Sequence, residues 1–268
     1  MITNTVTNTV LNSECANSSL QISLVSSIQS RTLYPHSLIS IIIPCYNESN
    51  TILQIIENIH KLNLTNYEII IVDDGSTDGT PEKLLQRGDI RLLLHDKNKG
   101  YGQTLLDGIN LARGDIIITM DGDGQHDPMD IPTLCDSILE KNTDVVVGSR
   151  YVGEYYYPIP FLNRAGEIFI EALLKLLFHQ SVRNNQGGFR AFHRRTKKIF
   201  KQVQFFDMAF TTELLMLSSI YGYRIEEVPI HLHGRCFGKS NVRKILLFFD
   251  ILKGFFYYYF RKVRTRSP

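Results

Sequence analysis

Two aspartates separated by one residue stand at the end of an apolar run in the middle of the chain. Asp121 and Asp123 follow residues 116–120, Ile-Ile-Ile-Thr-Met, which are typical of a buried β-strand. Side chains two residues apart in an extended segment face the same side, so both carboxylates can approach one ion. Hard oxygen ligands favour Mg²⁺ or Mn²⁺, which leave positions open for the phosphate oxygens of a substrate. The pattern therefore predicts a divalent metal site that neutralises a departing diphosphate.

Two more polar clusters follow apolar runs earlier in the chain. Residues 44–48 read Pro-Cys-Tyr-Asn-Glu at the end of the run 38–44, and residues 73–76 read Asp-Asp-Gly-Ser after the run 67–72. Turns and helix N-caps also favour Asp, Asn, Gly and Ser, so each cluster alone is more typical of a turn. Three clusters at equivalent ends of three strands favour one shared site.

The spacing of apolar residues predicts the elements that position these clusters. From Ser37 onward, short β-branched runs alternate with helical periods. The predicted strands are 38–44, 67–72, 90–94, 115–120 and 144–147, and the predicted helices lie near 48–62, 79–87, 101–113 and 131–141. This alternation indicates βαβ units and a largely parallel sheet that is covered on both faces. Ligands of such sheets bind at the carboxyl ends of the strands.

Two apolar segments lie in the second half of the chain. Polar side chains recur every four residues in 161–179, which predicts a helix that either packs under a second element or rests on lipid. A second run, 245–260, would be about 24 Å long as a helix, shorter than a hydrocarbon core of about 30 Å. Because Asp250 and Lys253 also interrupt this run, we expect it to lie at a membrane surface without crossing it.

The formal net charge is +2, but it is unevenly distributed. Residues 236–268 carry eight Lys or Arg and one Asp, which gives them +7 and leaves −5 on residues 1–235. The same end is rich in aromatic side chains such as Phe255 and Phe256. A basic and aromatic segment favours an anionic membrane surface over nucleic acid as its partner.

Cysteine spacing and the N-terminal residues indicate where the protein works. The four cysteines form no CxxC pair and no zinc-finger spacing, which predicts a reducing compartment. The first 36 residues are rich in Asn, Ser and Thr and do not read as a secretory signal, so we expect a flexible tail.

Three longer motifs together resemble those of a known family. They are Ile-Pro-Cys-Tyr-Asn-Glu at 43–48, Val-Asp-Asp-Gly-Ser-Thr-Asp-Gly-Thr at 72–80 and Met-Asp-Gly-Asp-Gly-Gln-His-Asp-Pro at 120–128. In this order they look like the family 2 glycosyltransferases of GT-A fold. Within that family the chain resembles the polyprenyl-phosphate branch, typified by dolichyl-phosphate mannosyltransferase. The resemblance covers roughly 38–245 and includes Gly-Phe-Arg at 188–190.

The resemblance implies an α/β GT-A fold, which is a Rossmann-like, mostly parallel sheet with flanking helices. To this fold the C-terminal segment adds an amphipathic, membrane-associated helix. The expected organisation is a polar tail at 1–36, a glycosyltransferase domain at 37–235 and a basic, aromatic interfacial segment at 236–268. Within the domain, 37–150 would bind nucleotide-sugar and metal, and 151–235 would bind the acceptor.

The resemblance also implies roles for individual residues. The nucleotide-sugar pocket would be lined by Pro44, Tyr46, Glu48, Asp73, Asp74, Asp121 and Gln125. Asp121 and Asp123 would bind Mg²⁺ or Mn²⁺ and, with Arg150, take part in catalysis. The donor diphosphate and the acceptor phosphate would be held by Arg150, Arg164, Arg235, Lys239 and Ser240. Arginine suits this task because its planar guanidinium can donate two hydrogen bonds to one phosphate.

Three positions in the acceptor half need separate treatment. Where the family tends to have Asp ahead of Gly-Phe-Arg this chain has Asn184, and where the family tends to have Ser before that Gly it has Gly187. Glu213 matches a position where the family often has an acid near the acceptor, which would make it catalytic. The alternative is a Glu in the first turn of a helix, where the helix dipole favours it. A strong base is not required, because a phosphate monoester is largely dianionic at about pH 7.

Three histidines allow more than one interpretation. His231 and His233 alternate along a predicted strand and could form part of a zinc site, but the sequence supplies no third ligand. Histidines at the surface or next to phosphate are the favoured interpretation. His126 follows the aspartate pair and either supports the metal site or is an ordinary loop residue.

The expected activity is inverting hexosyl transfer from a nucleotide-sugar to a polyprenyl phosphate, either dolichyl or undecaprenyl. GDP-mannose is the preferred donor, and UDP-glucose and UDP-N-acetylglucosamine are alternatives. Transfer to a glycan or protein hydroxyl and a catalytically silent nucleotide-sugar-binding scaffold are the other readings. The expected partners are donor, lipid acceptor, membrane surface and, as an option, a small membrane subunit, with no nucleic acid. The protein would be peripheral or monotopic at the cytoplasmic face of a membrane, in cell-envelope or protein glycosylation.

Overall fold

A single mixed β-sheet forms the centre of the protein. The computed structural model describes residues 34–152, 161–234 and 244–266. Within these residues the strands are ordered β3-β2-β1-β4-β6-β5-β7. The strand bounds are β1 Ile39–Cys45, β2 Tyr67–Asp73, β3 Arg91–Leu94, β4 Ile116–Thr119, β5 Val145–Ser149, β6 Arg190–His193 and β7 Ile225–Pro229. β6 runs antiparallel to both of its neighbours, and the other paired strands are parallel.

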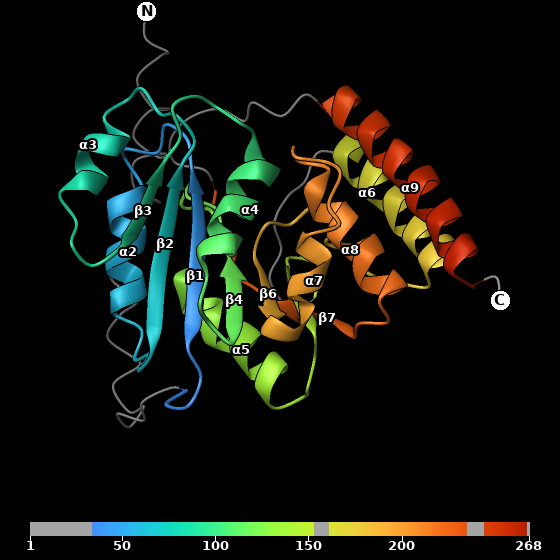
Figure 1. Ribbon diagram of the computed structural model, residues 1–268, viewed down its shortest axis with the longest axis horizontal. Coiled ribbons are helices and arrows are strands. Elements are labelled where there is room, and N and C mark those ends of the chain that lie inside the picture. Colours follow the sequence, from blue (N-terminus) through green and yellow to red (C-terminus); the bar gives the residue numbers. More distant parts are fainter. Residues whose placement is uncertain (1–33, 153–160, 235–243, 267–268) are drawn as a thin grey trace, which may run out of the picture.

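Helices cover both faces of the sheet (Figure 1). Their bounds are α2 Ile52–His60, α3 Thr80–Leu85, α4 Tyr101–Leu111, α5 Ile131–Leu139, α6 Phe161–Leu173, α7 Lys197–Phe200, α8 Phe210–Ile220 and α9 Lys244–Arg266. The strands alternate their side chains between the faces, so that Ile41 and Ile43 pack with α2 and α5 while Ile42 packs with α4. The α/β fold with a mostly parallel, covered sheet that the sequence predicts is therefore confirmed.

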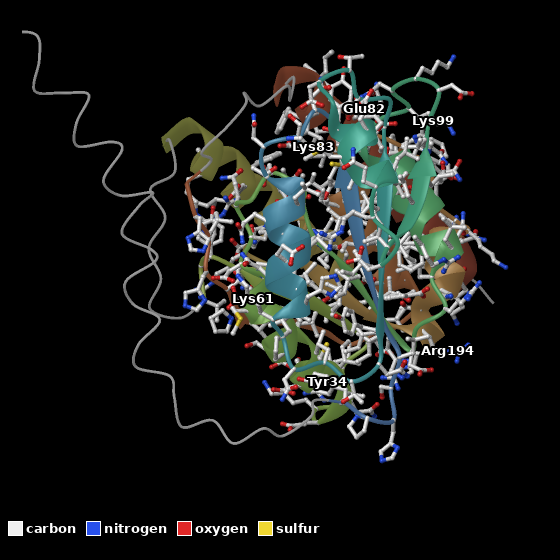
Figure 2. All side chains as sticks on the ribbon, turned by 90° about the vertical axis from the view of Figure 1, so that its left-hand side faces the viewer. Tyr34, Lys61, Glu82, Lys83, Lys99 and Arg194 are labelled. Atoms are coloured by element: carbon white, nitrogen blue, oxygen red, sulfur yellow. The ribbon has the colours of Figure 1, made fainter. Side chains whose placement is uncertain are left out.

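The edge of the sheet formed by the carboxyl ends of the parallel strands differs in its residues from the edge formed by their amino ends. The carboxyl ends of β1, β2, β4 and β5 open on one edge, which carries the acidic clusters. In Figure 2, Lys83 and Lys99 mark the end of the molecule where this edge lies, and Tyr34 and Arg194 mark the opposite end. Parallel strands thus bring the clusters to one place, as their spacing predicts.

The predicted strands do not include β6 or β7, and β6 is the one that changes the site. It is four residues long, and it inserts between β4 and β5, which are separated by α5 in the sequence. Thr119 pairs with Arg190, so the Gly-Phe-Arg motif lies beside the end of β4. Strands that come before and after residue 150 in the sequence therefore belong to the same sheet.

The predicted helix at 161–179 is confirmed with one local change. α6 continues into a π-helical turn at Leu174–Phe178, and His179 ends it in the left-handed conformation with φ 57°. α9 lies beside α6 through ring contacts of Phe169 with Phe248 and of Phe178 with Phe255, whose centroids are 5.7 and 5.8 Å apart. Among the helices of the described residues, none has both the length and the apolar character to span a bilayer.

Close packing of α4 on the sheet generates a prediction about stability. An added Cβ at Gly108 would lie 2.5 Å from Ile42 Cγ2, so Gly108→Ala should lower the free energy of unfolding by about 1–3 kcal/mol through overpacking. At Gly166, in α6, no atom lies within 4 Å of an added Cβ. Gly166→Ala should leave stability unchanged or raise it by up to about 1 kcal/mol, because alanine favours helix. Urea denaturation of both variants measures this, and equal effects would contradict the packing argument.

Candidate active site

The paired aspartates lie directly after β4, and hydrogen bonds hold both side chains. Asp121 Oδ1 accepts from the Tyr101 hydroxyl at 2.8 Å, and Asp123 Oδ1 accepts from the Gln125 backbone N–H at 3.0 Å. His126 Nδ1 lies 3.6 Å from Asp121 Oδ2, and the His126 ring packs on Phe189. His126 therefore neighbours the aspartate pair, as one of its two predicted roles requires.

The loops after β1, β2 and β4 are joined to one another. The Asp74 N–H donates to Cys45 O at 2.8 Å, and the Thr51 hydroxyl donates to Gly122 O at 2.7 Å. Asn47 adopts a left-handed conformation with φ 59°, and its N–H donates to the Ser76 hydroxyl at 2.8 Å. The structure thus brings the three predicted clusters into one site.

Asp73 and Asp74 are neighbours with different surroundings. Asp73 is buried, and its Oδ2 accepts from the Ser76 N–H at 3.0 Å, while its buried Oδ1 has no hydrogen-bond partner in the described part of the chain. Asp74 accepts from the N–H groups of Lys99 and Gly100 at 2.8 and 3.0 Å and also pairs with His95. Asp74 therefore fixes the loop before α4.

The other residues predicted to line the nucleotide-sugar pocket surround the same edge of the sheet. Pro44 is buried at the end of β1, Tyr46 is 39% exposed, and Glu48 is half-buried. Gln125 is joined to the segment after β7, because the His233 N–H donates to Gln125 O at 2.8 Å. Gln125 Nε2 also donates to His233 O at 3.3 Å, so the aspartate loop and residues 231–234 are held together.

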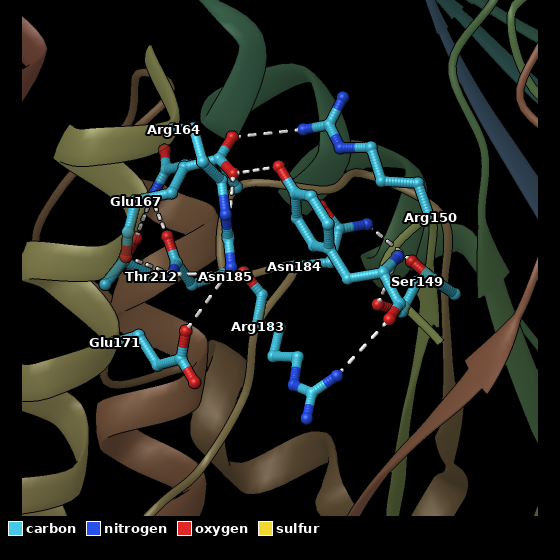
Figure 3. A network of polar contacts seen from close by, with 12 residues as sticks. Ser149, Arg150, Arg164, Glu167, Glu171, Arg183, Asn184, Asn185 and Thr212 are labelled. Atoms are coloured by element: carbon cyan, nitrogen blue, oxygen red, sulfur yellow. Dashed lines mark hydrogen bonds and ion pairs between the residues drawn. The ribbon is translucent and has the colours of Figure 1, made fainter. Parts of the chain in front are cut away.

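Arginines gather next to this edge, at the end of β5 (Figure 3). Arg150 Nη2 lies 3.1 Å from Glu167 Oε1, and Arg164 Nη1 lies 3.4 Å from Glu167 Oε2. The Arg164 guanidinium stacks over the Tyr151 ring at 4.0 Å, and the Tyr151 hydroxyl donates to Glu167. Arg150 Nε is buried without a hydrogen-bond partner among the described residues. Two predicted phosphate-binding arginines thus share one carboxylate, which the sequence analysis did not single out.

The two positions that differ from the family pattern contact each other. An added Cβ at Gly187 would lie 2.5 Å from Asn184 Nδ2, so a larger residue at 187 requires Asn184 to move. Asn184 Nδ2 donates to Gly148 O at 2.6 Å, in β5. Asn184 and Gly187 therefore form one local arrangement next to β5, the strand that precedes Arg150.

Glu213 lies in the first turn of α8 and is fully buried. Its carboxylate accepts from the backbone N–H groups of Gln204 and Phe205 at 2.6 and 3.1 Å and from the Tyr258 hydroxyl of α9. Burial raises the pKa of Glu213 to about 7, although these hydrogen bonds act in the opposite direction. The structure thus places the Glu213 side chain between α8 and α9. This position fits the alternative interpretation of Glu213 as a glutamate in the first turn of a helix, and its contacts do not include the arginines near β5.

Two residues beside Asp121, Tyr101 and Arg190, have no role among those predicted from the sequence. Tyr101 begins α4 between Gly100 and Gly102, a pair of glycines that could have drawn attention to it. Arg190 is buried, and its guanidinium donates to the backbone oxygens of Asn185, Gly187 and Thr211 at 2.5–3.0 Å. Burial lowers the pKa of Arg190 to about 10, and the nearby Tyr101, Glu227 and Asp121 oppose that shift.

Some predicted residues lie outside the part of the chain that the structure describes. These are Arg235, Lys239 and Ser240. His231 and His233 are described; they follow β7, which ends at Pro229, and do not lie within the predicted strand. They pair with Asp130 and Asp127 at 2.7 and 3.2 Å. Each histidine thus has a carboxylate neighbour of its own.

Asp121 and Asp123 can be tested for their fit to a metal ion. In the described ranges, no three or more His, Cys, Asp or Glu side chains form a group that could hold a metal by themselves. Mg²⁺ and Mn²⁺ sites at diphosphates commonly use one or two carboxylates and complete the shell with substrate oxygens and water. The aspartate pair, with its hydrogen-bonded orientation, fits that kind of site.

Comparison with known proteins identifies the family. The family model described as Glycosyl transferase family 2 matches residues 40–200. The chain belongs to glycosyltransferase family 2. A UDP-N-acetylglucosamine–dolichyl-phosphate N-acetylglucosaminyltransferase of Methanococcus voltae is 31% identical over 214 residues, covering 72% of this chain and 84% of that protein. A dolichol-phosphate mannosyltransferase of Pyrococcus furiosus is 30% identical over 220 residues, covering 78% of this chain and 60% of that protein.

Solved structures share the fold of this family 2 chain. Glucosyl-3-phosphoglycerate synthase from Mycobacterium tuberculosis, in complex with Mn²⁺, uridine diphosphate and phosphoglyceric acid, matches with a TM-score of 0.67 at 20% identity. The match covers 84% of this chain and 80% of that chain. The predicted GT-A fold and the predicted family are therefore both confirmed.

The burial of Glu213 generates a prediction about pH. A carboxyl whose pKa is raised by folding stabilises the folded state at pH values below its unfolded pKa, and this contribution is lost as the pH rises through the folded pKa, about 7. The stability of the wild type relative to Glu213→Gln should therefore fall between about pH 5 and pH 8, by about 3 kcal/mol at most. Chemical denaturation across that range measures it.

Glu82 provides the matched control for Glu213. It is also a first-turn acid, in α3, but its side chain is exposed. Glu82→Gln, measured over the same range, gives the change that replacing a surface glutamate produces. A pH dependence for Glu213→Gln no larger than that for Glu82→Gln would show that burial does not perturb the Glu213 carboxyl.

Proposed function

We propose that this family 2 glycosyltransferase transfers a sugar from a nucleotide-sugar to a polyprenyl phosphate with inversion at the anomeric carbon. The observation that carries the proposal is the placement of an acidic pair and an arginine pair on the strands that flank β6. Asp121 and Asp123 follow β4, and Arg150 follows β5 and lies next to Arg164. A donor diphosphate with its metal and an acceptor phosphate are two anions that such a site would hold side by side.

The donor would lie over the carboxyl ends of β1, β2 and β4. Asp73 Oδ1, buried and unpartnered within the described residues, is suited to accept a hydrogen bond from a nucleotide base. Tyr46 is exposed at the same edge and can cover the base. Pro44, Glu48 and Gln125 complete the pocket in this proposal. Asp74 would contribute indirectly, because it holds the loop before α4 in place.

Asp121 and Asp123 would hold Mg²⁺ or Mn²⁺ in this site. When bound, the cation supplies positive charge that stabilises the departing nucleoside diphosphate. The role of the chain is to orient the two carboxylates before the donor arrives, which Tyr101 and the Gln125 N–H do by hydrogen bonding. The Mn²⁺ complexes of the structural neighbour are consistent with this assignment.

The acceptor would bring its own nucleophile. An oxygen of the lipid phosphate attacks the anomeric carbon, the bond to the nucleoside diphosphate breaks, and the electron pair leaves with the diphosphate. Arg150 and Arg164 would hold the attacking phosphate, together with Arg235, Lys239 and Ser240 from the segment after β7. No proton has to be removed from a dianionic phosphate, so this reaction needs no general base.

Transfer to a hydroxyl group is the less favoured activity. It would need a base, and Glu213 was the predicted acid for that role. Its oxygens accept hydrogen bonds from Gln204, Phe205 and Tyr258 inside the protein, which supports the phosphate acceptor instead. The relatives from Methanococcus voltae and Pyrococcus furiosus are named for dolichyl-phosphate acceptors as well.

The donor sugar is proposed as mannose from GDP-mannose. The relatives name two donors for this type of acceptor, so UDP-N-acetylglucosamine is the first competing donor to test and UDP-glucose the second. The test is a panel of these donors with a short polyprenyl phosphate, in which mass spectrometry detects the glycosylated lipid. No product from any donor would reject the proposed function.

The same assay tests the metal site. Asp121→Asn and Asp123→Asn should each lower turnover by about 100-fold or more, because charge on the leaving diphosphate would go unneutralised. Asp115, at the opposite end of β4 and paired with Arg194 at 3.0 Å, is the matched control, and Asp115→Asn should keep most activity. Full activity of both site variants in the presence of a chelator would contradict metal dependence.

We further propose that the enzyme docks on a membrane through one apolar surface. This docking surface consists of exposed side chains on α6, on the π-helical turn that follows it and on α9, which are Ile168, Phe169, Leu176, Leu246, Phe249, Phe256 and Phe260. Leu176 and Phe256 are 71% and 67% exposed. α9 continues to Arg266 and carries basic residues from Arg261 onward, which anionic lipid would attract. Because the acceptor keeps its tail in hydrocarbon, peripheral attachment at the cytoplasmic face would bring the site to the headgroups.

Exposed positions on the docking surface allow a test that spares the core. Ile251, Phe255 and Tyr258 of α9 are buried, so truncating the helix would open the interior. The double variant Phe256→Ser, Phe260→Ser should instead reduce binding to anionic vesicles by about tenfold or more, since about 1.4 kcal/mol is tenfold. Wild-type binding should increase with anionic lipid and weaken with salt. Co-sedimentation measures all of these effects.

Leu85 supplies the control for vesicle binding. It is 65% exposed on α3, on the other side of the molecule from α9 (Figure 1). Leu85→Ser should leave vesicle binding unchanged. Equal loss in both variants, or no wild-type binding at any salt concentration, would reject the docking surface in favour of a contact with a partner subunit.

A further inference from the structure

A buried tyrosine hydroxyl makes polar contacts between α9 and the glycosyltransferase domain. Tyr258 is fully buried, and its hydroxyl lies 3.0 Å from Gln202 O and also contacts the Glu213 carboxylate. Arg261, one turn later, donates to Gln202 Oε1 at 2.5 Å. The polar contacts of α9 thus reach Glu213 and Gln202, and Gln202 begins residues 202–207 of the connection between α7 and α8.

The same residues are held from the other side by Glu213. Its two oxygens accept from the backbone N–H groups of Gln204 and Phe205, so the carboxylate of α8 fixes the peptide units of this connection. A buried carboxylate that orders two backbone N–H groups is costly to disturb, because each group would lose its partner away from water. Residues 202–207 therefore take their position from α8 and α9 together.

Residues 206 and 207 in turn pack against the first turn of α4. Phe206 O accepts from the Gln103 N–H at 3.1 Å. An added Cβ at Gly102 would lie 2.8 Å from Phe206 C and 2.9 Å from Asp207 O, and at Gly100 it would lie 3.1 Å from Phe206 O. The two backbones are in direct contact, with no side chain between them to absorb a shift.

Tyr101 stands between those two glycines and reaches the metal carboxylate. Its hydroxyl donates to Asp121 Oδ1 at 2.8 Å. An added Cβ at Gly188 would lie 2.3 Å from the Tyr101 hydroxyl oxygen and 2.6 Å from Asp121 Oδ1, so the backbone of Gly188 closes this pair from the side. Asp74 fixes the turn before Tyr101 through Lys99 and Gly100. The hydroxyl therefore has little freedom to follow Asp121 if the start of α4 moves.

We propose that α9 is coupled to Asp121 through residues 202–207 and Tyr101, so that the attachment of α9 sets the orientation of the metal carboxylate. Tyr101 and Tyr258 are positioning residues in this scheme. The proposal rests on the metal site of the proposed function and adds a part of the fold that sets its geometry. Contacts of this kind around a ligand commonly change metal affinity by about tenfold or more when they are removed.

Three phenylalanine variants test the coupling by removing one hydroxyl each. Tyr101→Phe and Tyr258→Phe should each weaken Mn²⁺ binding in the presence of UDP or GDP about three- to tenfold, measured by calorimetry on the full chain without membranes. The double variant should lose about as much as the weaker-binding single variant, because both changes act on one path. Tyr259→Phe is the matched control, because Tyr259 is 37% exposed and its ring contacts Phe260. It should bind Mn²⁺ like the wild type.

Hydrogen exchange gives a second measurement that does not depend on metal or nucleotide. Tyr258→Phe should speed amide exchange in residues 202–207 and at Gln103, whose N–H donates to Phe206, while Tyr259→Phe should not. Wild-type Mn²⁺ affinity and wild-type exchange at Gln103 in Tyr258→Phe would overturn the coupling. Independent, multiplying losses in the double variant would also overturn it. If the wild type itself binds no Mn²⁺ with either nucleotide, the donor site of the proposed function fails, and the exchange experiment still decides whether α9 is coupled to α4.

Discussion

The antiparallel pairing of β6 with β4 is the constraint on which the rest of the site depends. This register places Thr119 opposite Arg190, and the Thr119 hydroxyl donates to Gly188 O at 2.7 Å. Gly188 then lies so close to Asp121 and Tyr101 that no side chain fits at that position. A shift of β6 by one residue would exchange the two faces of the strand, both of which are buried, and would move a side chain into the Asp121 carboxylate. The orientation of Asp121 is thus a consequence of sheet register as much as of its own loop.

The same strand makes the two halves of the domain one unit. β6 lies in the sequence after residue 150, yet it pairs between β4 and β5, which both end before that residue. Arg190 then donates to the backbone oxygens of Asn185, Gly187 and Thr211, from a buried position close to Tyr101 and Asp121. A buried guanidinium with several acceptors is costly to release, because its charge would remain away from water. The residues before and after 150 are therefore fixed relative to each other by the sheet.

Features that depend on residues close together in the sequence could be predicted, whereas features that depend on contacts between distant residues could not. The strand ends, the aspartate pair and the apolar helices depend on local patterns, and the structure confirms their placement. β6 is too short to give a clear period, and it is adjacent to β4 only through long-range pairing. Glu213 shows the same limit, because position in a family motif indicated an acceptor-side acid while a contact with Tyr258, 45 residues away, gives it a buried place under α9. Tyr101 and Glu167 have no local signature for the partners that they meet.

Glu167 shows how Arg150 and Arg164 are accommodated beside each other without a bound phosphate. Arg150 and Arg164 lie close to one carboxylate, which balances two positive charges that would otherwise repel each other. On the proposed function, an acceptor phosphate must replace Glu167 as the partner of these arginines. Burial raises the pKa of Tyr151 to about 12, so its hydroxyl stays protonated and continues to donate to Glu167 when a guanidinium turns away. The carboxylate thus keeps one donor throughout the exchange, and a dianionic phosphate, with more charge and more acceptor oxygens than a carboxylate, is the kind of ligand that can displace it.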